Sequence, residues 1–156
     1  SKASDDIKQV SEGISDIVWN INPRYDNLEH LFIRMKRYAS DILDGKNISY
    51  DIKFPEQTGD WKLEMDKRRD LYLLFKEAVN NLAKYSSAKN ALIELSINDS
   101  QLQLKVEDDG VGFNPTTIAA GNGLQNMQQR AALLKGQLDL QTSPGKGTQL
   151  RLVMPV

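Results

Sequence analysis

Two segments in which apolar and polar residues alternate, 91–97 and 102–107, are separated by a short polar turn. An apolar residue at every second position is the pattern of a half-buried β-strand. The connecting residues Asn98, Asp99 and Ser100 are of the types that favour tight turns. Because a turn this short joins neighbouring antiparallel strands, we expect a β-hairpin, and a purely parallel sheet is excluded.

The segments on either side of the hairpin predict the remaining elements. Residues 28–43 have apolar side chains at helical spacing, residues 48–54 alternate as a strand, and Asp66 can cap a third helix. A helix ending near Gly136 and two further strands close the chain. Helices and strands do not alternate as a parallel sheet requires. We therefore expect an α+β fold, a two-layer α/β sandwich with a mixed, mostly antiparallel sheet covered by helices on one face.

The first 22 residues carry a different pattern. Isoleucine and valine recur from Ile7 to Ile21 at alternating steps of three and four, which is a heptad seam. Such a narrow stripe suits a helix in a coiled coil or four-helix bundle, and a surface helix on its own domain is the alternative. Asn22-Pro23 interrupts the helical pattern. The sequence therefore predicts a helical bundle or connector segment in residues 1–22 and a second unit in residues 23–156.

Charge and composition exclude several classes of function. The 20 Lys and Arg residues nearly balance the 21 Asp and Glu residues, and no long basic run is present, so we expect no nucleic-acid partner. The chain has no cysteine, which excludes disulfides and cysteine-ligated zinc and favours a reducing, cytoplasmic location. No apolar stretch is long enough to span a bilayer, so we expect no membrane contact from this segment.

The third predicted helix presents a group of polar residues. Glu77, Asn81 and Lys84 are spaced by four and three, which puts an acid, an amide and a cation on one helical face. This face lies opposite the apolar stripe that includes Phe75 and Val79. On spacing alone, the trio could also be an ordinary solvated face with a network between glutamate and lysine. The trio becomes informative only together with other motifs.

Three glycine-containing segments follow this helix. Asp108 to Gly112 ends a strand in two acidic residues and two glycines, although it could simply be a turn. Gly121 to Leu124 opens a helix, where glycines allow close approach of the backbone and free amides form an anion site. Gly145 to Thr148 precedes the last strand without the spacing of a P-loop. Each segment indicates little alone, but their order and separation are jointly specific.

Together these motifs resemble the ATP-binding fold shared by histidine kinases, gyrases, heat-shock chaperones and mismatch-repair ATPases. Glu77 to Lys84 resembles the asparagine box of that superfamily, and the three glycine segments resemble its glycine boxes. The resemblance covers residues 66–155. The box lysine and the segment Asn126 to Ala131 are most similar to sensor histidine kinases paired with NarL-type response regulators. Tyr85-Ser86 stands where that subfamily often has His-Ala.

The resemblance implies transfer of the γ-phosphoryl group of Mg-ATP to a histidine, with ATP and Mg²⁺ as the bound cofactors. In the fold that the chain resembles, Asp108 accepts a hydrogen bond from the exocyclic amine of adenine, and Asn81 offers its amide oxygen to Mg²⁺. Glu77 would order a metal-bound water or assist proton removal. The resemblance assigns catalytic roles to Glu77, Asn81 and Lys84, and nucleotide contacts to Asn80, Asn81, Lys84, Asp108, Gly110, Gly112, Gly121, Gly123, Leu124 and Thr148.

The resemblance also implies partners. Residues 1–22 would be part of the dimerisation and histidine-phosphotransfer hairpin, its second helix, in a homodimeric kinase that passes the phosphoryl group to a response regulator receiver domain. The only histidine, His30, follows the proline break and precedes Leu31, whereas an acceptor usually sits on the first bundle helix before an acidic residue. We interpret His30 as a surface residue and expect the acceptor to lie upstream of Ser1, so that this chain binds ATP without phosphorylating itself.

Two alternative functions stay open at this point. One is a nucleotide-binding interaction or sensing module that transfers no phosphoryl group. The other is an ATP-hydrolysing switch of the same superfamily, of the chaperone or mismatch-repair type. Turnover on a supplied histidine-bearing helix distinguishes the first alternative from a kinase, and steady ATP hydrolysis by the domain alone would favour the second.

Overall fold

The computed structural model describes residues 28–56, 61–112 and 123–156. The predicted heptad seam, the Asn22-Pro23 break and Gly121 lie outside the described residues. The described elements follow one another as α2 (Leu28–Gly45), β1 (Ser49–Lys53), α3 (Met65–Tyr85), β2 (Asn90–Asn98), β3 (Gln101–Asp108), α4 (Gly123–Leu133), β4 (Gln137–Thr142) and β5 (Thr148–Pro155).

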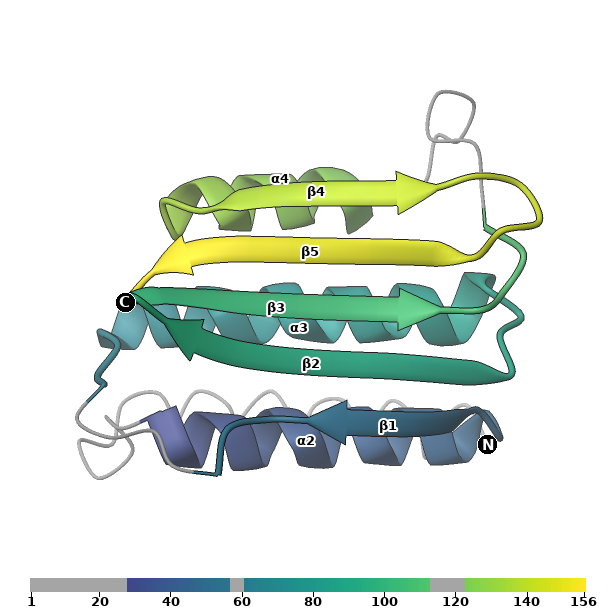
Figure 1. Ribbon diagram of the computed structural model, residues 1–156, viewed down its shortest axis with the longest axis horizontal. Coiled ribbons are helices and arrows are strands. Elements are labelled where there is room, and N and C mark those ends of the chain that lie inside the picture. Colours follow the sequence, from purple (N-terminus) through teal and green to yellow (C-terminus); the bar gives the residue numbers. More distant parts are fainter. Residues whose placement is uncertain (1–27, 57–60, 113–122) are drawn as a thin grey trace, which may run out of the picture.

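The strands form a single five-stranded sheet in the order β1-β2-β3-β5-β4. β1 runs parallel to β2, and the other neighbouring strands are antiparallel. Helices α2, α3 and α4 lie side by side on one face of the sheet, with α3 in the middle (Figure 1). The predicted α+β sandwich, with a mixed, mostly antiparallel sheet covered by helices on one face, is confirmed.

β2 and β3 form the predicted hairpin with a two-residue turn. Asn98 pairs with Gln101 across the turn, and Asp99 and Ser100 have positive φ angles of 52° and 62°. Two central residues with positive φ identify a type I′ turn, whose twist matches that of the flanking strands. The turn fixes the register of the pair, and this register runs unbroken to Asp108 at the far end of β3.

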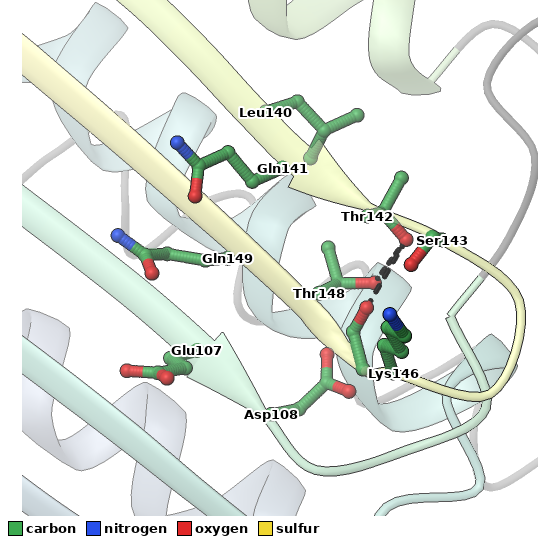
Figure 2. A pocket seen from close by; sticks show the side chains of 10 residues that line it. Glu107, Asp108, Leu140, Gln141, Thr142, Ser143, Lys146, Thr148 and Gln149 are labelled. Atoms are coloured by element: carbon green, nitrogen blue, oxygen red, sulfur yellow. Dashed lines mark hydrogen bonds between the residues drawn. The ribbon is translucent and has the colours of Figure 1, made fainter.

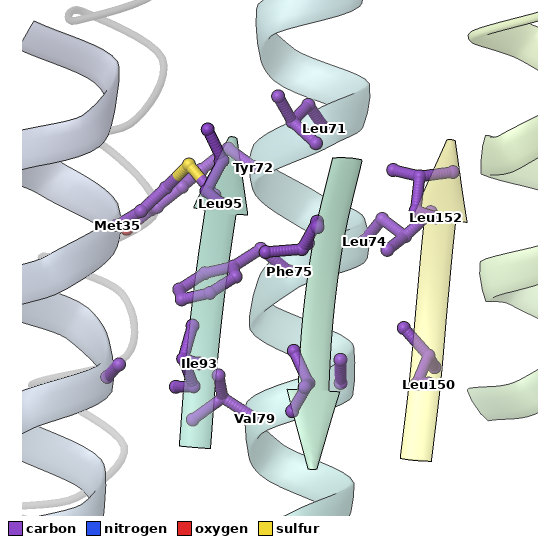
Figure 3. Close-up of a cluster of buried hydrophobic side chains, with 14 of the residues drawn as sticks. Met35, Leu71, Tyr72, Leu74, Phe75, Val79, Ile93, Leu95, Leu150 and Leu152 are labelled. Atoms are coloured by element: carbon purple, nitrogen blue, oxygen red, sulfur yellow. The ribbon is translucent and has the colours of Figure 1, made fainter. Parts of the chain in front are cut away.

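The hydrophobic core lies between the helices and the inner face of the sheet. From α3, Leu71, Leu74 and Phe75 are fully buried, and Figure 3 shows them packed against the strands. Burying one such side chain contributes roughly 1.5–3 kcal/mol to folding. β3 turns every second side chain towards this core, and the alternation that buries its apolar residues continues to Asp108. The register of β3 therefore places the Asp108 carboxylate on the inner face, at the end of the sheet.

The predicted cap of α3 is wrong by two positions. The helix begins at Met65 with Glu64 as its N-cap, and the amide of Arg68 donates to the carbonyl oxygen of Glu64 at 2.8 Å. Asp66 lies inside the first turn, where its carboxylate accepts from the amide of Lys67 at 2.9 Å. A carboxylate in the first turn still stabilises the helix, because it faces the positive end of the helix dipole. Asp66 therefore marks the first turn of α3 through its charge and is not the N-cap.

Candidate functional site

Three polar side chains share one row across the end of the sheet. Asp108 of β3 pairs with Thr148 of β5, and Thr148 pairs with Thr142 of β4. Cross-strand partners project to the same face of a sheet. All three side chains therefore stand on the helix-covered face, one step beyond the apolar pair Val106 and Leu150. We call Asp108, Thr148 and Thr142 the polar row.

A cavity of about 490 Å³ opens beside the polar row (Figure 2). The Thr142 and Thr148 hydroxyl oxygens are 2.9 Å apart, and the Thr142 hydroxyl donates to the Gly147 carbonyl oxygen at 3.2 Å. The turn between β4 and β5 supplies much of the remaining wall. The cavity is lined by Glu107, Asp108, Leu140, Gln141, Thr142, Ser143, Lys146, Gly147, Thr148 and Gln149.

The Asp108 carboxylate is half-buried and held by backbone amides. Its Oδ1 accepts from the Gly110 amide at 2.8 Å. Burial raises the pKa of Asp108, and the neighbouring charges of Asp109 and Glu107 add to the rise, while backbone hydrogen bonds from Gly110 and Thr148 oppose it. A carboxylate in this position is a fixed hydrogen-bond acceptor facing a cavity.

The adjacent carboxylate, Asp109, serves the fold instead. Its Oδ1 accepts from the amides of Lys89 and Asn90, both at 2.9 Å, and its Oδ2 accepts from the Asn90 side chain at 2.9 Å. Hydrogen bonds from Asn90, and then from Lys89, lower the pKa of Asp109. The two neighbouring acids therefore differ in role, since Asp109 fastens the end of β3 to the start of β2.

The glycines of this region are needed for backbone contact. A Cβ on Gly110 would lie 2.0 Å from the carbonyl oxygen of Ser86, and a Cβ on Gly147 would lie 2.2 Å from that of Asp108. Gly112 has a φ of +62°, and a Cβ there would lie 2.0 Å from the carbonyl oxygen of Ser143. Any side chain would force these segments apart. Two of the predicted glycine segments are thus packed against each other and against the end of α3.

The polar face of α3 lies towards α4. Asp70, Leu74, Glu77 and Asn81 follow one another at steps of four, three and four, so they share one helical face. Asp70 is buried and pairs with Arg130 of α4, with 3.3 Å between Oδ1 and Nη1. Because this pair lies between the two helices, Glu77 and Asn81 face the same side of α3 as α4. Both side chains are half-buried.

Lys84 and Asn80 have different surroundings from each other on α3. Lys84 is exposed in the last turn of the helix. Asn80 faces α2, where its Oδ1 accepts from the Tyr38 hydroxyl at 2.9 Å. The assignment of Asn80 to nucleotide contact stays a prediction, and its side chain is already held by Tyr38 through the amide oxygen.

The structure thus brings the predicted residues together in two groups. The segment Asp108 to Gly112 and Thr148 meet at the polar row, while the segment Glu77 to Lys84 lies on α3 and is not among the residues that line the cavity. The groups are linked through Ser86, against which Gly110 packs. Ser86 follows Asn81 by five residues, a distance of about 7–8 Å along a helix axis.

The predicted helix start at Gly123 and Leu124 is also present. α4 begins at Gly123, and Leu124 packs half-buried against the core. A short connection leads from α4 into β4, which ends at Thr142 in the polar row. Because the helix and this strand run in opposite directions, the N-terminus of α4 lies at the same end of the sheet as Asp108 (Figure 1).

Sequence reasoning missed two residues of the site. Thr142 continues the alternation of β4 and faces Thr148 across the last turn, so the period of β4 and the length of the turn could have indicated it. Ser86 is buried at the C-cap of α3, where its carbonyl oxygen accepts from the Val111 amide at 2.7 Å. Its contact depends on tertiary packing and leaves no signal in the local sequence.

Residues 66–156 match the family model described as histidine kinase-, DNA gyrase B-, and HSP90-like ATPase. This match spans more than half of the chain. The chain belongs to this ATPase family. Membership implies that the domain binds ATP, and the polar row, the glycine segments and most of α3 all lie within the matched residues.

Curated relatives of this ATPase domain are sensor histidine kinases. The chain is 29% identical over 123 residues to the sensor histidine kinase LiaS of Bacillus subtilis, covering 78% of this chain and 34% of LiaS. It is 32% identical over 93 residues to an uncharacterised sensor-like histidine kinase of Chloroflexus aurantiacus, covering 55% of this chain and 16% of that protein. The chain spans about a third of LiaS and a smaller part of the Chloroflexus protein.

A solved structure supports the fold assignment within the ATPase family. The blue-light activated histidine kinase EL346 of Erythrobacter litoralis is similar with a TM-score of 0.71 at 20% identity, covering 97% of this chain and 49% of that chain. Identity this low shows the fold alone. No helix among the described residues is long and apolar enough to cross a membrane.

Proposed function

We propose that this chain is the catalytic part of a sensor histidine kinase that transfers the γ-phosphoryl group of Mg-ATP to a histidine. The observation that carries the proposal is the half-buried Asp108 carboxylate beside the cavity at the end of the sheet, in a member of an ATPase family. Amides fix this acceptor before any ligand arrives. A fixed acceptor at a cavity wall suits the exocyclic amine of adenine.

This acceptor also supports selection against guanine. Guanine carries a carbonyl oxygen where adenine carries its amine, so two acceptors would face each other. The unpaired groups would keep their desolvation cost, and such a mismatch at a polar site lowers affinity by roughly a hundredfold or more. Asp108 would therefore determine the base, with Gly110 and Gly112 keeping the backbone close to the ligand.

The polar face of α3 suits the phosphate end of the nucleotide. The amide oxygen of Asn81 and the carboxylate of Glu77 are hard oxygen donors one turn apart on one face. This donor set fits Mg²⁺, which takes few protein ligands and keeps several waters while bridging phosphates. Asn81 would hold the ion through its amide oxygen, and the ion when bound would neutralise phosphate charge.

The remaining residues would position the phosphates for transfer. Lys84 supplies a positive charge at the exposed end of α3, and the amides of Gly123 and Leu124 offer the free donors of a helix start. Asn80 would add its amide nitrogen. Glu77 would orient a water or accept a proton from the acceptor histidine. Phosphoryl transfer is achieved largely by such positioning and charge neutralisation.

The wider assignment concerns partners and location. We propose that residues 1–22 belong to the dimerisation and histidine-phosphotransfer hairpin of a homodimeric kinase, and that a response regulator receiver domain takes the phosphoryl group. The sensor kinase relatives support this arrangement. A cytoplasmic position, where ATP is available and thiols stay reduced, agrees with the absence of cysteine. The only histidine in the chain, His30, is half-buried on α2.

The test is calorimetric titration with Mg-ATP, Mg-ADP and Mg-GTP. The parent chain should bind the adenine nucleotides and not GTP. Asp108→Asn should lose most of the affinity for ATP, because an amide presents a donor that competes for the acceptor position. Asn81→Ala should abolish the magnesium dependence of binding and leave the thermal midpoint of the apoprotein unchanged. Equal affinities for ATP and GTP in the parent would contradict the proposed function.

A further inference from the structure

Thr142 is a member of the polar row that the proposed function does not use. It ends β4 and pairs with Thr148, and its side chain is half-buried beside the cavity. Its hydroxyl oxygen lies 3.2 Å from the carbonyl oxygen of Gly147 and 2.9 Å from the hydroxyl oxygen of Thr148 (Figure 2). Thr142 therefore connects the turn before β5 with the hydroxyl that stands next to Asp108.

The direction of these hydrogen bonds follows from the chemistry of the groups. A carbonyl oxygen can only accept, so the single hydroxyl proton of Thr142 lies on its contact with Gly147. A hydroxyl group has one proton, so if Thr142 uses its proton on Gly147, the contact between the two threonines takes its proton from Thr148. With its proton used in this way, Thr148 has only lone pairs to offer to the cavity. Since the carboxylate of Asp108 is also an acceptor, the row presents acceptors alone.

We propose that Thr142 is a positioning residue that determines base specificity by holding Thr148 as an acceptor. This inference rests on the proposed function. At the 6-position, where Asp108 accepts in the proposed function, the amino group of adenine brings N–H donors that suit acceptors, although the neighbouring ring nitrogen N1 is itself an acceptor. Hypoxanthine brings a 6-oxo oxygen that only a donor can satisfy, and Thr148 influences the choice of base through its contact at this position. If the partner of its proton were lost, Thr148 would donate into the cavity, and the 6-oxo purine would be tolerated.

The experiment measures the ratio of affinities for Mg-ATP and Mg-ITP in the parent chain and in Thr142→Val. ITP carries hypoxanthine, which differs from adenine in having the 6-oxo group. Valine keeps the shape of threonine and removes the hydroxyl. The preference for ATP over ITP should fall by roughly three- to tenfold, the equivalent of one neutral hydrogen bond. Competition against a fluorescent ATP analogue measures both affinities on one scale.

Three controls separate proton placement from a structural effect. Thr142→Ser keeps the hydroxyl and should retain the parent ratio. Thr142→Ala removes the hydroxyl with a smaller side chain and should repeat the effect of valine, so the inference stays testable if one variant fails to fold. In a Thr148→Val background, where no proton remains to be redirected, Thr142→Val should leave the ratio unchanged.

The outcomes distinguish this inference from the function on which it rests. If the parent binds ATP but Thr142→Val and Thr142→Ala keep its ratio, the role of Thr142 is wrong and the proposed function is unaffected. If Thr142→Ser lowers the ratio as much as Thr142→Val, side-chain shape controls specificity and the inference is overturned. If the parent binds neither nucleotide, the proposed function fails and this inference with it.

Discussion

The two ends of the candidate site are built in different ways. At the sheet end, register places Asp108, Thr148 and Thr142 in one row, and hydrogen bonds fix their side chains. On α3, Glu77 and Asn81 are half-buried and Lys84 is exposed, and none of these three side chains forms a hydrogen bond or ion pair with another described residue. The sheet end is organised by its own hydrogen bonds, whereas the described residues supply no such partners to these three side chains on α3.

Under the proposed function, the sheet end would select the base, and the face of α3 would bind phosphate and metal through charge. A preorganised acceptor loses little entropy when it binds, and it penalises a mismatched ligand strongly. Charged and amide groups on an open helical face adapt to phosphate and metal, and they contribute little to folding. Substitutions at the sheet end should therefore affect base choice, and those that disturb its backbone contacts should also lower stability. Substitutions on the face of α3 should affect binding more than stability.

The largest expected effect is on stability and comes from Gly110→Ala. A Cβ at this position would lie 2.0 Å from the carbonyl oxygen and 2.7 Å from the carbonyl carbon of Ser86, so two backbone segments must separate. Overpacking against backbone should lower the free energy of unfolding by about 2–4 kcal/mol. Urea unfolding followed by circular dichroism measures the change, and nucleotide affinity should fall with it.

The matched control for this substitution is Gly45→Ala. Gly45 ends α2, and a Cβ there would have no atom within 4 Å. This variant should unfold within about 0.5 kcal/mol of the parent. If Gly110→Ala were equally harmless, the loop could move away from Ser86 without cost. The sheet end would then be no more rigid than the face of α3, and the difference proposed between the two regions would be wrong.

The second prediction compares Asp108→Asn with Asp109→Asn. Burial raises the pKa of Asp108, so its contribution to stability is present below the usual value of 3.8 and is lost as pH rises through the raised pKa. Hydrogen bonds from Asn90 and Lys89 lower the pKa of Asp109, so its contribution is present above 3.8 and is lost as pH falls through the lowered pKa. The two substitutions should therefore shift stability in opposite directions at neutral pH.

Thermal unfolding of the apoprotein at a series of pH values tests this contrast. At pH 7, Asp109→Asn should lower the midpoint by a few degrees, and Asp108→Asn should leave it unchanged or raise it slightly. Both differences should shrink in acid, where the carboxyls of the parent are protonated. A loss of stability with Asp108→Asn as large as that with Asp109→Asn would mean that Asp108 is a structural acid rather than a ligand-binding one.

Much of the fold could be predicted because its elements carry local signals. The alternation of residues 91–97 and 102–107 and the turn residues Asp99 and Ser100 determine the hairpin, and helical spacing determines α2 and α3. The cap of α3 was misplaced because Asp66 favours both the cap and the first turn. The parallel pairing of β1 with β2 is a long-range arrangement, and no local pattern indicates it.

The candidate site was predictable where a residue belongs to a spaced motif, as with Asn81 and Asp108. Thr142 was missed because a threonine at the end of a strand is common, and its meaning depends on register across three strands. Ser86 was missed because its role is a backbone contact with Gly110, which forms only when the end of α3 reaches the end of β3. Side-chain chemistry leaves a sequence signal, whereas tertiary packing of backbone does not.

The smallest expected effect comes from Lys84→Ala, compared with Lys67→Ala on the same helix. Both lysines lie on α3, Lys84 exposed in its last turn and Lys67 half-exposed near its start, about 25 Å apart along the axis. Lys84→Ala should weaken Mg-ATP binding by roughly three- to tenfold at low salt, and the loss should shrink at high salt because ions screen an exposed charge. Lys67→Ala should leave affinity unchanged, since it lies beyond the screening length from the phosphate end.

A larger loss of Mg-ATP affinity for Lys84→Ala than for Lys67→Ala would show that a local charge, rather than the net charge of the domain, binds the phosphates. Lys84 also faces the negative end of the helix dipole, so its loss should cost about 0.3–1 kcal/mol of stability, which unfolding of the apoprotein measures separately. Equal losses of affinity in the two variants would place the phosphates away from the end of α3. The face of α3 would then be an ordinary solvated surface, and only the sheet end would remain as a binding site.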